Sequence, residues 1–253
     1  FEQKLIQAEK MRALGEMAGG VAHHFNNKLQ SVIGSLDLMR LEMGNAGQLF
    51  PHFEENLSRT MRSALEAAEI SRKLVIYLGQ SYARSKKVDL HRFLRDMESR
   101  WLLRSPEGPG FLLLLPEEPV SLTVNEDELD QLLEPVITNG LEAAPKSPLQ
   151  VELLTTRPAP LPDPQVRQPE DWSPGDSPWV LLQITDQGVG IPGKNLSQLF
   201  DPFFTTKFTG RGLGLPVCLG LVKRYQGAIE VHSLPEKGTT VRIWLPLEPQ
   251  PDA

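Results

Sequence analysis

The chain has 253 residues, of which 40% are hydrophobic and 23% are charged, as expected for one large or two ordinary globular domains. Its formal net charge of −6 argues against general binding to nucleic acid or to anionic membranes, because both are polyanions. The charge is unevenly distributed, since residues 1–87 carry a net +3 and the remainder a net −9. This asymmetry indicates two parts with different functions.

Cysteine content and hydropathy bear on where in the cell the chain is located. Cys218 is the single cysteine, so we expect no intrachain disulfide, no multi-cysteine metal site and a cytoplasmic location. No apolar run approaches the roughly 20 residues of a membrane span, and we expect no membrane contact by this chain. The sequence starts within a charged helical pattern rather than a signal peptide. We interpret it as a fragment whose parent protein could be membrane-anchored.

The first third of the chain predicts two long helices. Residues 1–43 contain no proline, and their apolar side chains follow alternating steps of three and four, as in a heptad seam. The seam comprises Met11, Leu14, Ala18, Val21, Phe25, Val32 and Met39, with Leu29 and Leu36 one position over. "GNAG" at 44–47 breaks this helix, and a second apolar pattern spans about 52–82. Its stripe comprises Leu57, Met61, Ala64, Ala68, Val75 and Leu78. One hairpin cannot bury both stripes, so we expect two chains to form a dimeric four-helix bundle.

From Val88 onward, strand patterns alternate with helical ones. Strands are predicted at 149–156, 179–186, 228–234 and 239–247, and helices at 89–104, 126–144 and 213–226. The alternation predicts an α/β sandwich. The segment 157–178 is rich in Pro, Asp and Gly, and we expect it to be an exposed, unstructured hairpin loop. The expected domains are therefore 1–84 and 88–248.

Two adjacent histidines lie in the stretch "GGVAHHFNNKL" at 19–29. With Ala18 and Phe25 at heptad position a, His23 falls at f and points away from the partner helices, whereas His24 falls at g beside the seam. A nucleophile that must meet a nucleotide carried by another domain has to be exposed, which favours His23. Asn27, one turn later, shares its face. An isolated exposed histidine would more simply be solvated surface, so the neighbouring residues decide.

The longer stretch "EKMRALGEMAGGVAHHFNNKLQSVIG" resembles the phosphoacceptor box of the sensor histidine kinases of two-component systems, in the subgroup that carries His-Asp-Phe-Asn-Asn. The resemblance aligns His23 with the phosphorylated histidine and makes His23, His24 and Asn27 the candidate catalytic residues. His24 stands where the family has an acidic residue that orients the imidazole and takes its proton. A neutral imidazole is a weaker acceptor than a carboxylate and titrates near pH 6.5.

The stretch "DQGVGI" at 186–191 resembles the glycine box that receives adenine in these kinases and in gyrase-like ATPases. In that role Asp186 accepts a hydrogen bond from the exocyclic amine of adenine, next to Ile191. Gly188 and Gly190 let the backbone come close to the flat base. Two glycines after an aspartate would alone indicate only a tight turn.

Two further stretches, "FDPFFTTK" at 200–207 and "GRGLGL" at 210–215, resemble the phenylalanine box and the second glycine box. In the family these boxes frame a mobile lid over the ATP phosphates, and Gly214 leads into a helix whose N-terminus suits phosphate oxygens. Lys207 and Arg211 either contact the phosphates or are ordinary lid surface. The resemblance implies nucleotide contacts at Phe203, Thr206, Lys207, Gly210, Arg211, Gly212, Leu213, Gly214 and Leu215, and later in the chain at Thr240.

The stretch "NEDELDQLLEPVITNGLEAAP" at 125–145 resembles the asparagine box least closely. Asn139 aligns with the asparagine that helps hold Mg²⁺ in the family, but Pro135 replaces the companion asparagine four residues earlier. A proline inside a helix removes the amide bond to Gln131 and is expected to kink the axis. Glu134 either turns into the gap as an oxygen ligand for a hard cation or lies on the surface.

Together, these stretches predict a homodimeric sensor histidine kinase core with a Bergerat-type ATP-binding fold. The resemblance implies that it uses ATP and Mg²⁺, phosphorylates His23 and passes the phosphoryl group to an aspartate of a response-regulator receiver domain. His24 and Pro135 favour one alternative, a degenerate kinase that acts as a phosphotransfer or docking scaffold. A gyrase-like or chaperone-like ATPase is a third interpretation, which the histidine hairpin counts against.

Overall fold

The computed structural model describes residues 29–30, 32–37, 39, 53–77, 84–104, 108, 110–156, 166–167, 178–207 and 212–247. Contacts divide the chain into two compact units, 1–81 and 82–253. Five candidate site residues lie outside the described residues: His23, His24, Asn27, Gly210 and Arg211.

The first unit contains helical residues between 29 and 39 and the helix α2, Phe53–Tyr77. Of the predicted stripe, Leu57 and Ala64 are buried and Met61, Ala68 and Val75 are half-buried, and Ser71 and Ile76, which the stripe did not include, are buried as well. In the first helical segment, Val32 and Met39 are 46% and 48% exposed although both belong to the predicted seam. The four-helix bundle itself is not visible in a single chain.

The second unit is built on a six-stranded mixed sheet in the order β2-β4-β6-β8-β7-β5. The strands are β2 Phe111–Leu114, β4 Leu149–Thr156, β5 Val166–Arg167, β6 Trp179–Asp186, β7 Ala228–Leu234 and β8 Gly238–Pro246. β2 runs parallel to β4, and the other neighbouring pairs are antiparallel. A separate antiparallel ribbon joins β1, Lys86–Asp89, to β3, Ser121–Val124.

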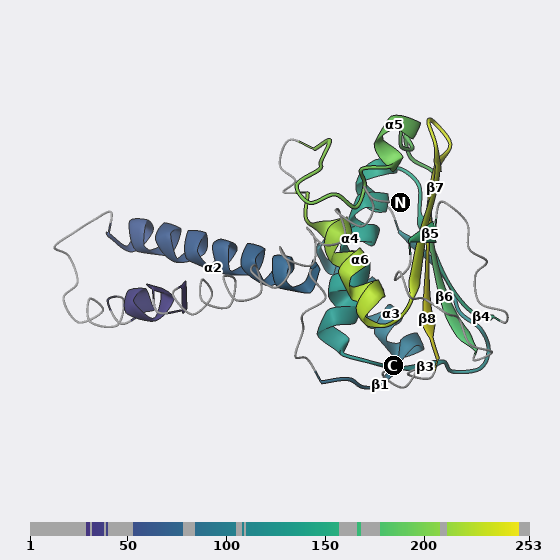
Figure 1. Cartoon of the computed structure of the whole chain (residues 1–253), viewed down its shortest axis with the longest axis horizontal. Coiled ribbons are helices and arrows are strands. Elements are labelled where there is room, and N and C mark those ends of the chain that lie inside the picture. The colour runs from purple at the N-terminus through teal and green to yellow at the C-terminus, as the bar shows by residue number, and fades with distance from the viewer. Residues whose placement is uncertain are drawn as a thin grey trace, which may run out of the picture. The chain divides into compact units, whose positions relative to one another are not determined.

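Helices α3 (Leu90–Arg104), α4 (Glu126–Ala143) and α6 (Gly214–Arg224) lie on one side of the sheet (Figure 1). The short helix α5 covers Gly193–Leu196. The core fills the space between sheet and helices with fully buried side chains, among them Leu132, Leu133 and Ile137 of α4, Leu182 of β6, Leu221 of α6 and Ile229 of β7. The predicted α/β sandwich is therefore confirmed.

In the second unit, the sequence predicted the ends of the long helices and strands to within two residues, but it missed the short ones. β1, β2, β3 and α5 have four residues each, which is too few for a period to show in the sequence. β5 corrects the expectation that all of 157–178 is unstructured, because Val166 and Arg167 pair with Glu230 and Ile229 of β7. Helix α4 continues through Pro135 from Glu126 to Ala143.

Candidate nucleotide-binding site

The candidate site is assembled around the C-terminal half of α4. A Cβ added to Gly188 would lie 2.4 Å from the carbonyl oxygen of Ala143, and one added to Gly140 would lie 3.6 Å from Cβ of Asp186. A larger residue at Gly188 would push the adenine box away from the helix, whereas one at Gly140 would be in ordinary contact with Asp186 and would clash with Leu149 instead. The asparagine box and the adenine box, far apart in the sequence, are therefore in direct contact.

Asp186 ends β6 and is only 6% exposed. Its Oδ1 accepts a hydrogen bond from the Gly188 amide at 2.8 Å, and its carboxylate also accepts hydrogen bonds from the amide and hydroxyl of Thr239. Burial raises the pKa of Asp186, and these hydrogen bonds only partly oppose the shift. A buried carboxylate held in a fixed orientation is suited to accept a hydrogen bond from an amine.

The backbone after Asp186 is fixed against the turn between β7 and β8. Gly190 has a φ of +64°, and a Cβ there would lie 2.0 Å from the carbonyl oxygen of Leu234. The Ile191 amide donates to Ser233 Oγ at 2.8 Å, and the Glu236 amide donates to the Val189 carbonyl at 2.8 Å. The predicted adenine loop is thus a rigid turn that only glycine permits at position 190.

The threonine next to Asp186 is Thr239, whereas the sequence suggested Thr240. In the antiparallel pairing of β6 with β8, Asp186 lies opposite Thr239 and Thr185 lies opposite Thr240. Successive side chains of a strand point to opposite faces, so Thr240 Oγ1 lies 3.2 Å from Thr185 Oγ1 on the other side of the sheet. In the structure, therefore, Thr239 and not Thr240 lies beside Asp186.

The two ends of the predicted lid are joined at its base. The Phe203 amide donates to the Gly212 carbonyl at 2.9 Å, and a Cβ on Gly212, with a φ of +63°, would lie 2.5 Å from the Phe203 carbonyl carbon. Phe203 itself has a φ of +67° and is 62% exposed. Thr206 is exposed, and Leu215 is half-buried. This base brings Phe203 of the phenylalanine box and Gly212 of the second glycine box into contact.

Helix α6 begins at Gly214, directly against the proline of α4. A Cβ on Gly214 would lie 2.9 Å from Cβ of Pro135, so the glycine permits close packing of the lid helix on α4. The N-cap residue Leu213 is buried and makes no side-chain capping bond. The Leu213 side chain therefore does not bond the first backbone amides of α6. Amides at a helix start have to lack such a bond if they are to bind a phosphate.

Lys207 bonds two residues of α4. Its Nζ donates to Asn139 Oδ1 at 2.6 Å and forms an ion pair with Glu142 Oε2. Amide and carboxylate oxygens gathered around a cation fit a hard divalent metal ion such as Mg²⁺. No group of three or more His, Cys, Asp or Glu suited to a metal occurs among the described residues.

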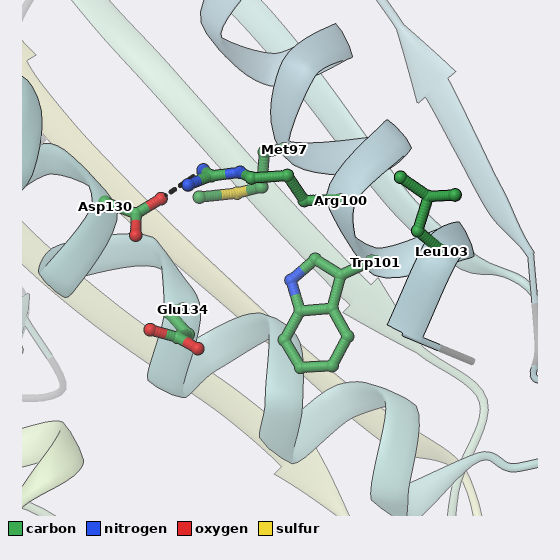
Figure 2. Close-up of a pocket in the computed structure, with 6 residues that line it drawn as sticks. All are labelled: Met97, Arg100, Trp101, Leu103, Asp130 and Glu134. Carbon is green, nitrogen blue, oxygen red and sulfur yellow. Dashed lines mark hydrogen bonds and ion pairs between the residues drawn. The ribbon is translucent and has the colours of Figure 1, made fainter. Parts of the chain in front are cut away.

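Glu134, the other ligand that the sequence suggested, lies elsewhere. It lines a pocket between α3 and α4 together with Met97, Arg100, Trp101, Leu103 and Asp130. Figure 2 shows the Arg100–Asp130 ion pair at one end of this pocket and the indole of Trp101 on the α3 side. Glu134 is therefore half-buried in the pocket between α3 and α4.

Sequence reasoning missed Ser233, Thr239 and Glu142. Thr240 was chosen from "GTT" at 238–240, but the strand register places its neighbour Thr239 opposite Asp186. Glu142 lies three residues after Asn139, a spacing that places both on one helix face. That spacing placed Glu142 beside Asn139, but its contact with Lys207 is set by the fold.

Comparison with known proteins agrees with this geometry. Residues 124–249 match the family of histidine kinase-, DNA gyrase B- and HSP90-like ATPases, so the fold and site define an ATP-binding domain of this class. The chain is 32% identical to the sensor kinase CckA of Brucella abortus over 97% of its length and 25% of that protein. It is 29% identical to sporulation kinase A of Bacillus subtilis over 97% of its length and 36% of that kinase. Over nearly its whole length the chain is thus similar to sensor and sporulation kinases, and residues 124–249 carry the match to the ATPase family.

Solved structures show the same fold. Full-length ShkA in complex with AMPPNP superimposes with a TM-score of 0.66 at 18% identity, covering 91% of this chain and 45% of that one. The mycobacterial sensor histidine kinase MprB matches with a TM-score of 0.50 at 24% identity, over 66% of this chain and 99% of that one. No helix among the described residues is long and apolar enough to cross a membrane.

Proposed function

We propose that the chain is a kinase core that binds ATP in its second unit and transfers the γ-phosphoryl group to His23. The phosphoryl group then passes to an aspartate of a response-regulator receiver domain. The observation that carries this proposal is the buried Asp186 carboxylate, fixed by Gly188 and Thr239 beside an α4 that also contacts the lid. We further propose a cytoplasmic location, in keeping with the lone, buried Cys218.

The residues of the second unit divide the binding of ATP between them. Asp186 accepts a hydrogen bond from the adenine amine, and the start of α6 at Gly214, where the N-cap side chain makes no capping bond, is the candidate to face phosphate oxygens. Asn139, whose Oδ1 already bonds an ammonium, would hold Mg²⁺. When bound, Mg²⁺ neutralises charge on the phosphates.

The transfer step makes one bond and breaks one. A ring nitrogen of His23 attacks the γ-phosphorus in line, an N–P bond forms, and the bond to the bridging oxygen breaks as ADP leaves. The attacking nitrogen has to be unprotonated, and the imidazole proton on the other nitrogen is lost afterwards. His24 and Asn27, its neighbours in the sequence, are our candidates to orient His23 and to take that proton.

We propose that two chains pair through the first unit, with the hairpin domain at 1–84 and the ATP-binding domain at 88–248. Val32 and Met39 are predicted seam residues, yet each is nearly half exposed in the single chain. A second copy of the helical hairpin would cover them, because every chain presents the same apolar stripe.

Labelled nucleotide tests the proposal. Incubation with γ-labelled Mg-ATP should label the chain through a bond that is labile to acid and stable to alkali, as a phosphohistidine is. Asp186→Asn should remove the label, because its amide presents a donor as well as an acceptor to the adenine amine. An acid-stable label, or a fully labelled Asp186→Asn variant, would contradict the proposal.

A further inference from the structure

One turn of α4 presents two oxygen ligands to a single cation. Asn139 and Glu142 are three residues apart, so their side chains share a face of the helix. The Lys207 ammonium lies 2.6 Å from Asn139 Oδ1 and is ion-paired with Glu142 Oε2. The two oxygens therefore converge on one position that already holds a compact positive charge.

The two oxygens at this position also suit a divalent cation. Mg²⁺ is bound through a small number of protein oxygens, with water and substrate phosphates completing its coordination. Pro135 has no side-chain oxygen, and its ring packs against Gly214. Glu134 lines the pocket between α3 and α4 (Figure 2). Glu142 is thus the carboxylate of α4 that shares a cation with Asn139.

We propose that Glu142 is a second protein ligand for Mg²⁺ beside Asn139, and that the Lys207 ammonium competes with the metal for the same two oxygens. This inference rests on the proposed function, since it specifies how that site holds its metal. In the binding reaction, Mg²⁺ replaces the ammonium at Asn139 and Glu142. Lys207 is then free to turn toward a phosphate.

The exposure of the ion pair makes the exchange feasible. The Lys207 and Glu142 side chains are 43% and 55% exposed, and ion pairs at such positions contribute little stability because water screens them. Lys207 adjoins the lid segment whose base joins Phe203 to Gly212. Arrival of the metal would therefore release a lid residue from α4.

The first experiment measures how strongly Mg²⁺ enhances ADP binding to the 253-residue chain. Calorimetry gives the ADP affinity in EDTA and at saturating Mg²⁺, and their ratio is the metal enhancement. Glu142→Gln should lower this ratio about tenfold or more, in the range seen when metal-site residues are altered, while the affinity in EDTA is kept. Glu134→Gln, the same change on the same helix, should keep the ratio of the parent.

The second experiment tests the competition. In Lys207→Gln the ammonium is gone, so half-maximal enhancement should occur at a several-fold lower Mg²⁺ concentration than in the parent. Binding of Mn²⁺ to the ADP complex, followed by electron paramagnetic resonance, should tighten in the same variant. A lysine that served only the phosphates would instead weaken ADP binding in EDTA and leave the Mg²⁺ midpoint unchanged.

The two experiments test the ligand role of Glu142 and the competition by Lys207 separately. An unchanged enhancement in Glu142→Gln would overturn the ligand role, and an unchanged or higher Mg²⁺ midpoint in Lys207→Gln would overturn the competition. In both cases ADP still binds, so the proposed function would stand. If the parent bound no ADP under any condition, the proposed function would fail, and this inference with it.

Discussion

Asp186 is a buried titratable side chain, so the pH dependence of the stability of the chain tests whether its carboxyl group lies in a desolvating site. Its pKa is raised mainly by burial, so the folded chain holds this proton more tightly than the unfolded chain does. The stabilising contribution of the group is fully present below the ordinary aspartate pKa of 3.8. It is lost as the pH rises through the raised value.

We therefore predict a pH-dependent difference between the parent and Asp186→Asn, which cannot titrate. As the pH rises from about 3.5 to 6, a range that starts near the aspartate reference pKa, the parent should lose unfolding free energy relative to the variant. Urea denaturation without nucleotide measures this difference. Asp201→Asn, a change of an exposed aspartate, is the control for the loss of one carboxylate. A difference that stays flat or runs in the opposite direction would show that Asp186 is not held in a desolvating environment.

For single residues, the sequence predicted which residue types form the site better than it predicted which residues are in contact. Asp186, Gly188 and Gly190 were identified because their chemistry is local, an acceptor followed by two positions where the backbone has to approach closely. Thr239 was missed because its face depends on the pairing of β8 with β6. Glu142 was missed because its contact with Lys207 depends on how the lid residues fold back onto α4.

Helices α4 and α6 are joined by hydrogen bonds at one end of their contact and by close packing at the other. The Asn125 side chain caps α4 by accepting from the Glu128 amide at 3.1 Å, and the Asn125 amide donates to Tyr225 Oη at 3.0 Å. The buried Glu128 accepts from the Tyr225 hydroxyl and from Arg224 Nε. Burial raises the pKa of Tyr225 to about 12, so this hydroxyl keeps its proton at neutral pH. The opposite end is closed where Gly214 meets Pro135.

We predict that the lid base depends on glycine at 212. An alanine there would combine a positive φ with a Cβ 2.5 Å from the Phe203 carbonyl carbon, and such strain costs about 1–3 kcal/mol. Gly212→Ala should lower the unfolding free energy by that amount and weaken ADP binding. Gly193→Ala is the control, because a Cβ at that position meets nothing within 4 Å. Urea denaturation and calorimetry of both variants provide the measurement, and equal behaviour of the two would contradict the account of the lid base.

Element length explains how much of the fold could be predicted. β6 alternates between buried and half-exposed residues over most of its eight positions, and α4 keeps a buried face through eighteen. Such runs contain several periods and are visible in the sequence. β1, β3 and β5 contain too few residues to show a period, and tertiary pairing fixes them. α4 also shows that packing overrides propensity, because the helix continues through Pro135.

For the whole molecule, we predict a homodimer joined by the first unit. Light scattering at tens of micromolar should give about twice the 28.2 kDa of one chain. Val32→Glu should shift the molecule toward the monomer, because an unpaired charge buried in the seam would cost several kcal/mol. Gln30→Glu alters an exposed residue of the same helix at heptad position f and should leave the dimer intact. A monomeric parent, or a Val32→Glu variant as dimeric as the parent, would refute the bundle.

The central claim is that His23, rather than His24, receives the γ-phosphoryl group from ATP held at Asp186. Phosphopeptide mapping of the parent after reaction with labelled Mg-ATP, alongside His23→Gln and His24→Gln, tests it most directly. We predict one labelled histidine in the parent, no label in His23→Gln, and label still on His23 in His24→Gln, at a rate that reports any part His24 has in proton transfer. Full labelling of His23→Gln would contradict the assignment.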